Sequence, residues 1–155
     1  MLFDARERLK LSDKFLDLYR GRQPKWGPLG YVTFKRTYAR VVHGDGGRTE
    51  EYWETVRRVV EGCYTIQWNH CRNLKLPWNQ QKAQRSAQEM FNLMWEFRFL
   101  PPGRGLWMMG TDYIYERGSA ALNNCAFVST DEISFSFSEP FCFLMDMSLL
   151  GVGVA

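Results

Sequence analysis

The sequence predicts a mostly α-helical N-terminal region over residues 1–100, followed over residues 101–155 by a mixed region with a helix and one or two strands. Two observations support the helical part. Apolar side chains recur every three or four residues in two long segments, and each segment is followed by a proline. A third observation marks the boundary, because the Pro-Pro-Gly sequence at residues 101–103 ends the second helical pattern and glycine-rich sequence follows.

The first fifty residues contain short elements. Ser12 is placed to cap a helix over residues 13–20. Residues 23–30 form a connector rich in Pro, Gly and Trp. Residues 31–42 are rich in β-branched and aromatic side chains with partial alternation, which favours an extended strand, and residues 43–48 form a glycine-rich turn.

The two long helices are expected over residues 49–74 and 79–99, on either side of Pro77. Each has one apolar face for a core. Gly62 lies inside the first helix and is a weak point there, since glycine destabilises a helix interior by about 1 kcal/mol relative to alanine. The apolar faces consist of Trp53, Val56, Val59 and Val60 in the first helix and of Ala83, Ala87, Met90, Phe91, Met94 and Trp95 in the second.

The C-terminal region is expected to be structurally incomplete. Residues 121–129 are a strand candidate, residues 140–150 an apolar helix, and residues 151–155 the start of a turn or strand. A lone strand leaves its backbone edges unpaired, so other strands should complete the sheet. We therefore expect either a truncated chain or assembly with a second polypeptide.

Composition excludes several classes of protein. The 155 residues are 45% hydrophobic with a net charge of +3, which is compatible with anionic ligands such as nucleotides but falls short of a nucleic-acid-binding surface. No run of about 20 apolar residues is present to span a membrane, and residues 1–14 lack the apolar core of a secretory signal. We expect a cytoplasmic protein whose four cysteines are reduced unless catalytic.

No familiar catalytic or metal-binding set is present. Cys63, His70 and Cys71 lie close in sequence, but their spacing fits no zinc module, so ordinary thiols are favoured and no metal site is predicted. Serine-hydrolase, zinc-protease and dinucleotide-binding motifs are absent. Most carboxylates fall on charged helical faces where solvated surface is expected, namely those of Glu50, Glu51, Glu54 and Glu61.

Three segments are candidates for chemistry. In residues 101–113, Gly103 would let backbone N–H groups approach a phosphate and Arg104 would add charge, although a structural turn is favoured on residue types alone. In residues 122–128, Cys125 follows two amides; a buried core thiol is favoured over a redox thiol, yet buried amides need polar partners such as a ligand. Residues 140–153 favour a buried helix that ends at glycines. Asp146 within this helix requires a polar partner or a place at the edge of the buried surface.

Taken together, these segments resemble the N-terminal region of the monomeric, adenosylcobalamin-dependent (class II) ribonucleoside-triphosphate reductases. The resemblance covers about residues 25–154, with its motifs in the order found in the family. The motifs are WGPLGYVTFKRTYAR at residues 26–40, ETVRRVVEG at 54–62, PGRGLWMMGTDY at 102–113, LNNCAFV at 122–128, and the segment 140–153.

The resemblance implies a helical region that leads into the first strand of a ten-stranded α/β barrel, here incomplete. It implies that Cys125 is a redox-active cysteine whose partner cysteine lies outside this chain. Asn123 and Asn124 would flank the substrate, together with the glycines of the last segment, Gly151 and Gly153. Gly103 and Arg104 would contact substrate phosphates, and the helix near residues 138–149 would belong to an effector region that includes Ser138, Pro140, Phe141 and Asp146.

The same resemblance implies reduction of ribonucleoside triphosphates to 2′-deoxyribonucleotides for DNA synthesis. The partners would be a thioredoxin-like reductant and the remainder of the reductase polypeptide. The thiyl cysteine and most of the adenosylcobalamin surface would lie beyond Ala155, so the isolated chain would be inactive. Two alternatives stay open from the residues: a non-catalytic remnant that binds a partner through its aromatic surface, and a small basic nucleic-acid-binding module.

Overall fold

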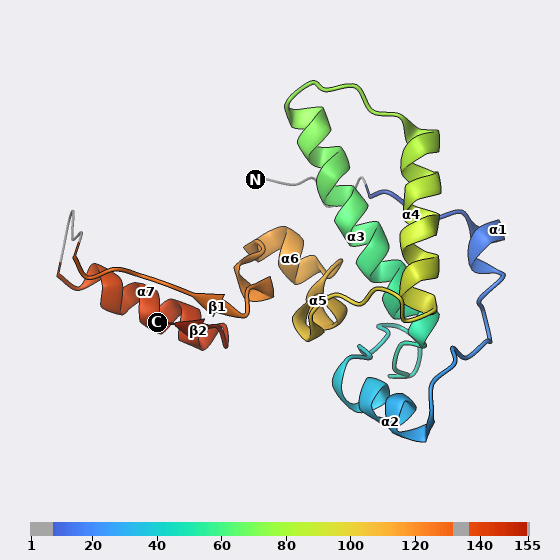
Figure 1. The fold of residues 1–155 in the computed structure, drawn as a ribbon, viewed down its shortest axis with the longest axis horizontal. Coiled ribbons are helices and arrows are strands. Elements are labelled where there is room, and N and C mark those ends of the chain that lie inside the picture. Colours follow the sequence, from blue (N-terminus) through green and yellow to red (C-terminus); the bar gives the residue numbers. More distant parts are fainter. Residues whose placement is uncertain (1–7, 132–136, 155) are drawn as a thin grey trace.

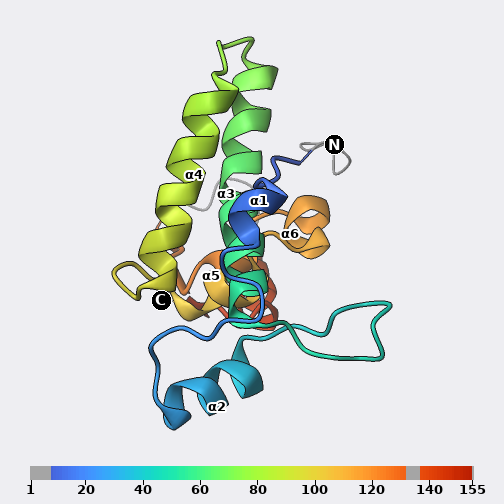
Figure 2. The ribbon, with the colours of Figure 1, turned by 90° about the vertical axis from the view of Figure 1, so that its right-hand side faces the viewer.

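The computed structural model describes residues 8–131 and 137–154. Its centre is an antiparallel pair of long helices, α3 (Tyr52–Asn73) and α4 (Gln80–Trp95), which lie side by side in both views (Figures 1 and 2). The short helices α1 (Asp13–Leu16) and α2 (Pro28–Thr37) lie against or below this pair. The remaining elements lie on the side of the helical pair away from α1 (Figure 1). In chain order they are α5 (Gly103–Met108), α6 (Asp112–Arg117), a 3₁₀ turn η1 (Ala120–Leu122), β1 (Cys125–Ala126), α7 (Glu139–Leu149) and β2 (Gly153–Val154).

The hydrophobic core lies between α3 and α4, as the spacing of apolar side chains predicts. Val56 and Val60 of α3 and Phe91 of α4 are fully buried. Aromatic rings extend this core toward the N-terminal segment, where Phe15 and Tyr19 pack on Phe91 with ring centroids 5.3 and 4.7 Å away. The core therefore joins residues that are about seventy positions apart in the sequence.

Polar caps fix where the long helices begin. Glu51 and Glu54 form a reciprocal capping box at the start of α3, and the Asn79 side chain accepts a hydrogen bond from the backbone N–H of Lys82 at the start of α4. The predicted starts and ends were too wide by a few residues. Thr49 is not helical, because it pairs with Val41 in an isolated antiparallel bridge.

The prediction of an extended strand over residues 31–42 was wrong, because most of this segment belongs to helix α2. Pro28 occupies the first turn of α2, where its fixed φ favours helix and its missing N–H is not needed. Phe34 is the buried residue of the helix and contacts the rings of Trp26 and Tyr52. Tertiary contact with these rings outweighs the β propensity of the sequence. At α1, Ser12 is the N-cap residue but forms no side-chain cap.

The backbones of α3 and of the turn after α5 approach closely at two glycines. A Cβ atom added to Gly62 would lie 2.7 Å from the Cα of Gly110, and one added to Gly110 would overlap the carbonyl of Arg58. Gly62 is thus a contact residue as well as the weak helix position expected from the sequence.

An ion pair strengthens the contact between α3 and the segment around α5. Glu50 is 8% exposed and forms a salt bridge of 2.7 Å with Arg58, so the expectation of a solvated Glu50 was wrong. Arg58 also donates to the carbonyls of Leu106 at 2.9 Å and Met109 at 2.6 Å. These bonds tie the helical pair to α5.

The C-terminal elements form a small parallel unit in which β1 and β2 pair on either side of α7 in sequence. Cys125 is opposite Gly153 and Ala126 is opposite Val154. The expected strand over residues 121–129 is limited to Cys125–Ala126, because only two residues of β2 are available to pair with it. The expected buried helix over residues 140–150 is present as α7, but among its described residues only Pro140 is buried.

Candidate active site around Cys125

Cys125 lies in β1 with its side chain exposed and unoxidised. The preference for a buried core thiol, made from residue types, was therefore wrong. The residue opposite it in the ladder is Gly153, which carries no side chain. The thiol consequently lies on an accessible part of the strand with no bulky cross-strand neighbour, an arrangement suited to a thiol that must meet another molecule.

The two amides that precede Cys125 are also exposed. The backbone carbonyl of Asn124 accepts a hydrogen bond of 3.0 Å from the N–H of Gly153, which is part of the parallel pairing. Among the hydrogen bonds of the described residues, none uses the side chain of Asn123 or Asn124. Both side chains are thus available to a polar ligand beside the thiol.

Arg104 lies where the segments leading into the two strands meet. Its Nη1 donates to the carbonyl oxygens of Leu150 at 3.1 Å and of Ala121 at 3.3 Å, and its Nη2 donates to the carbonyl of Gly151. The structure thereby links Arg104 to Gly151, two residues before the glycine that lies opposite Cys125, and so connects three separate motifs.

Gly103 does not share this position. It begins α5, and a Cβ atom added to it would lie 3.1 Å from the ring of Tyr38. The segment 103–108, for which the sequence favours a turn, is a six-residue helix. What the structure shows for Gly103 is close packing against an aromatic ring.

The four residues assigned to an effector region lie on or beside α7. Ser138 is its N-cap, Pro140 is buried in its first turn, and Phe141 and Asp146 are exposed. An apolar groove of about 540 Å³ runs along this helix and includes Phe141, Leu144, Met145 and Leu149.

The cysteines of α3 lie in a different environment. Cys63 is half-buried, and this burial raises the pKa of its thiol, so it is less readily ionised than an ordinary cysteine. Cys71 and His70 lie near the C-terminal end of α3. Over residues 8–131 and 137–154, no three His, Cys, Asp or Glu side chains are grouped to hold a metal ion.

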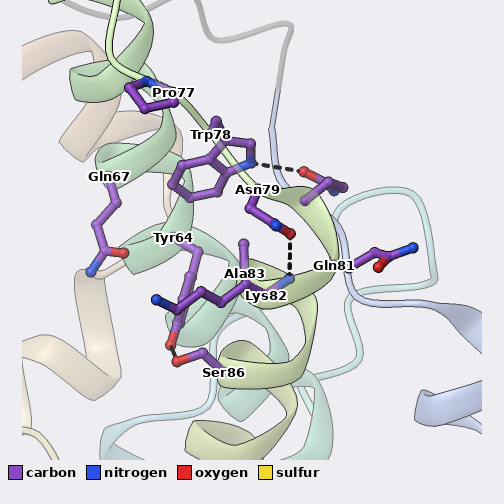
Figure 3. A pocket seen from close by; sticks show the side chains of 10 residues that line it. Tyr64, Gln67, Pro77, Trp78, Asn79, Gln81, Lys82, Ala83 and Ser86 are labelled. Atoms are coloured by element: carbon purple, nitrogen blue, oxygen red, sulfur yellow. Dashed lines mark hydrogen bonds between the residues drawn. The ribbon is translucent and has the colours of Figure 1, made fainter.

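A cleft of about 910 Å³ lies elsewhere, between the second half of α3 and the start of α4. Figure 3 shows Trp78 above Tyr64, whose hydroxyl is 2.6 Å from that of Ser86, with Lys82 alongside. None of the candidate site residues lines this cleft. It is an open surface feature of the helical pair, separate from the thiol.

Within the part of the chain that the structure describes, no helix is both long enough and apolar enough to cross a membrane.

Comparison with known proteins gives a consistent set of relatives. Residues 11–111 match the model of the ribonucleotide reductase alpha domain. The chain is 47% identical over 151 residues to a probable adenosylcobalamin-dependent ribonucleoside-triphosphate reductase of Dictyostelium discoideum, with 96% of this chain and 20% of the relative covered. It is 45% identical to the adenosylcobalamin-dependent ribonucleoside-triphosphate reductase of Euglena gracilis, covering 96% of this chain and 21% of that protein.

The structure is similar to the crystal structure of a B12-dependent (class II) ribonucleotide reductase, with a TM-score of 0.74 and 36% identity. That comparison covers 94% of this chain and 22% of the solved chain. The chain thus spans about a fifth of the length of the relatives it matches.

Proposed function

We propose a function from the following premise: the chain belongs to the ribonucleotide reductase alpha domain family. In a complete reductase it supplies one of the two thiols that reduce the substrate, together with the start of the catalytic barrel. The proposed reaction is the conversion of ribonucleoside triphosphates to 2′-deoxyribonucleotides, in keeping with relatives from Dictyostelium discoideum and Euglena gracilis that are named ribonucleoside-triphosphate reductases. Alone, the chain is inactive, because it holds only one part of the site.

The observation that carries this proposal is the exposed Cys125 opposite Gly153, next to two amides with unused side chains. In the proposed reaction, Cys125 and a second cysteine from the remainder of the polypeptide are oxidised to a disulfide. Their two electrons and two protons reduce the 2′ carbon, and the 2′ hydroxyl leaves as water. A thioredoxin-like dithiol then restores both thiols by exchange.

The neighbouring polar and glycine residues are proposed to form part of the substrate pocket. Asn123 and Asn124 offer amide donors and acceptors to the ribose. Gly151 and Gly153 leave room for the nucleotide beside the thiol. The expectation that Gly103 and Arg104 contact a phosphate stays a prediction.

Adenosylcobalamin is the cofactor named in the relatives, of which this chain covers about a fifth. A corrin ring already holds its cobalt, so what a protein must supply is a large surface for the ring and for the adenosyl group. We propose that the remainder of the reductase polypeptide supplies most of that surface, and we derive no step through the cofactor.

The parallel unit of β1, α7 and β2 is proposed to begin a ten-stranded α/β barrel. Parallel strands joined through a helix are the repeating element of α/β structures. Both strands have only one partner within the described residues, so further strands would extend the sheet. The residues Ser138, Phe141 and Asp146, which are exposed on or beside α7, are proposed to face an effector site completed by other parts of the enzyme, with the buried Pro140 in the first turn of the helix.

The proposal is tested in a chimeric reductase in which this chain replaces the aligned part of the Dictyostelium discoideum relative. We expect the chimera to form deoxyribonucleotides over many turnovers with an external dithiol. Cys125→Ser should abolish multiple turnover, because no disulfide can form and be reset. Cys142→Ser, which removes the other exposed thiol, should leave turnover unchanged. Normal turnover by the Cys125→Ser chimera would contradict the proposal.

A second candidate function is favoured by the exposed apolar side of α7, where Phe141 is 66% and Leu149 81% exposed. In this alternative the chain is a non-catalytic remnant that binds a partner protein. A chain that forms a stable complex with a partner, while its chimera reduces no ribonucleotide, would support the remnant over the reductase.

A further inference from the structure

The segment that carries Cys125 is held by very few bonds of its own. β1 and β2 are two residues each. One further hydrogen bond, of 3.0 Å, runs from the N–H of Gly153 to the carbonyl of Asn124, the residue before β1. A short ladder specifies its register weakly, and a slip of one residue would turn every side chain to the opposite face of the sheet. A slip would also place a valine, Val152 or Val154, opposite Cys125 in place of Gly153. Something outside the ladder must therefore fix the register.

Arg104 supplies such a constraint. Its guanidinium reaches the carbonyl of Ala121, in the turn before β1, and the carbonyls of Leu150 and Gly151, just before β2. One rigid side chain thus contacts both segments that lead into the strands. The planar fork of arginine suits this task, because several N–H groups point in fixed directions. We call this set of three contacts the Arg104 bridge.

The electrostatics of α7 favour the same contacts. The last carbonyls of a helix have no partner within the helix and carry its partial negative charge. Leu150 is the C-cap of α7, and the last turn of α7 contains no basic residue. Arg104, from another helix, therefore provides the positive charge and the donors that the end of α7 itself does not.

Gly151 permits the approach of the guanidinium. Its φ is +74°, a conformation that side-chain-bearing residues rarely adopt, and a Cβ atom there would lie 3.2 Å from Nη2 of Arg104. Gly151 thus has a role in this contact that is separate from its proposed place in the substrate pocket.

We propose that Arg104 is a positioning residue for Cys125: the Arg104 bridge fixes the register in which Gly153 lies opposite the thiol. This inference rests on the proposed function for its catalytic meaning, but the geometry is a property of this chain. It also differs from a phosphate contact, because the guanidinium acts through backbone carbonyls and not on the substrate.

The first test uses the intact chain and requires no enzyme activity. Arg104→Met should accelerate hydrogen exchange of the Gly153 amide at least about tenfold, which corresponds to the loss of about 1.4 kcal/mol of local protection. Exchange within α3 and α4 should be unchanged. Arg104→Lys should give an intermediate rate, because an ammonium group keeps the charge but lacks the fork. Arg117→Met, which removes an exposed arginine of α6 that has no hydrogen bond or ion pair within the described residues, should have no effect.

A second pair of variants tests the bridge from the glycine side. Gly151→Ala should reproduce the faster exchange of Gly153, because a Cβ atom would displace the guanidinium. Gly118→Ala is the matched control, since Gly118 also has a positive φ of +88° but nothing within 4 Å of an added Cβ atom. Unchanged exchange in both Arg104→Met and Gly151→Ala, or equal acceleration in α3, would overturn the proposal.

The third test distinguishes positioning from substrate binding in the chimeric reductase. If Arg104 positions Cys125, Arg104→Met lowers kcat at least about tenfold and leaves the KM for the ribonucleotide within about twofold. If Arg104 contacts a phosphate, KM rises and the Gly153 amide keeps its slow exchange, which would overturn the inference. An inactive wild-type chimera would count against the proposed function, while the exchange measurements on the chain would still decide the role of Arg104.

Discussion

The two parts of the molecule differ in how far each buries its own apolar surface. In the helical part, residues 8–100, α3 and α4 enclose Phe91, Val56 and Val60 completely. In the C-terminal part, residues 101–154, the longest helix is α7, yet Phe141, Met145 and Leu149 are 64–81% exposed. The first part is held by a large hydrophobic core. The second buries a few apolar side chains, among them Ile114, Ala121 and Val152, and is otherwise held by one two-residue ladder and by hydrogen bonds to backbone carbonyls.

The candidate chemistry lies in the part with the smaller core. Cys125 is on a two-residue strand that directly follows the two amides, and the Arg104 bridge connects the segments before β1 and β2 to α5. Arg58 and the Gly62–Gly110 contact connect α5 to α3. The helical pair therefore serves as the base from which the thiol-bearing segment is positioned, through α5.

The largest expected difference between the two parts is in the free energy of unfolding that is lost when a phenylalanine in each part is replaced by alanine. Phe91→Ala removes a fully buried ring from the core of α3 and α4 and should lower the free energy of unfolding by about 4 kcal/mol. Phe141→Ala, on the exposed side of α7, should change it by less than about 0.5 kcal/mol. Urea denaturation followed by circular dichroism measures both. Similar losses for the two variants would show that α7 contributes to the core.

The junction between the parts should depend on a buried charge. Arg58→Met removes the ion-pair partner of the buried Glu50 and leaves two backbone carbonyls, those of Leu106 and Met109, without this donor, so we expect a loss of about 3 kcal/mol. Arg57→Met, one residue earlier, breaks a more exposed pair with Glu61 and should cost about 0.5 kcal/mol. Equal effects in thermal or urea unfolding would argue against a special role for the Glu50–Arg58 pair.

Gly62→Ala tests the helix contact by the sign of its effect. Helix propensity alone would make alanine stabilising by about 1 kcal/mol at this position. Because the new Cβ atom would lie 2.7 Å from Gly110, we expect instead a loss of about 2 kcal/mol. A more stable Gly62→Ala variant would mean that α3 and the turn after α5 are not in close contact.

The smallest expected effect is a difference in thiol reactivity. Burial raises the pKa of Cys63, so at pH 8 a smaller fraction of it is thiolate, and its half-buried side chain is also less accessible. Iodoacetamide should therefore alkylate the exposed Cys125 about ten times faster than Cys63, as measured by mass spectrometry of the labelled peptides. The rate at Cys63 should rise with pH through a pKa above that of an ordinary thiol. Faster labelling of Cys63 at pH 8 would contradict its burial.

Several features followed from sequence patterns because they depend on local chemistry. The long helices were predicted from the spacing of Val56, Ala87 and Phe91, and Pro77 lies in the connection between them as expected, although both helices are a few residues shorter than predicted. The apolar helix α7 and the turn or strand after it were predicted in the same way. The family was also identified from its motifs, in agreement with the relatives found.

Other features were missed or predicted wrongly because their causes are distant in the sequence. The helical state of α2 depends on contacts of Phe34 with Trp26 and Tyr52, which compete with the β propensity of the segment. The short helices α5 and α6 follow glycine-rich sequence that gives no helical period. The burial of Glu50, which precedes α3, depends on its ion pair with Arg58, and Arg58 is only one of several charged residues in α3.

The sequence by itself determined where the long helices form, that Cys125 stands in a short strand after two asparagines, and which family the chain belongs to. Periodicity, caps and prolines act over one or two helical turns, so one sequence segment is enough to read them. Only the tertiary structure decided that the thiol is exposed opposite Gly153 and that Arg104 contacts the carbonyls on both sides of it. Those relations join residues up to about fifty positions apart, and long-range packing and hydrogen bonding leave no local pattern in the sequence.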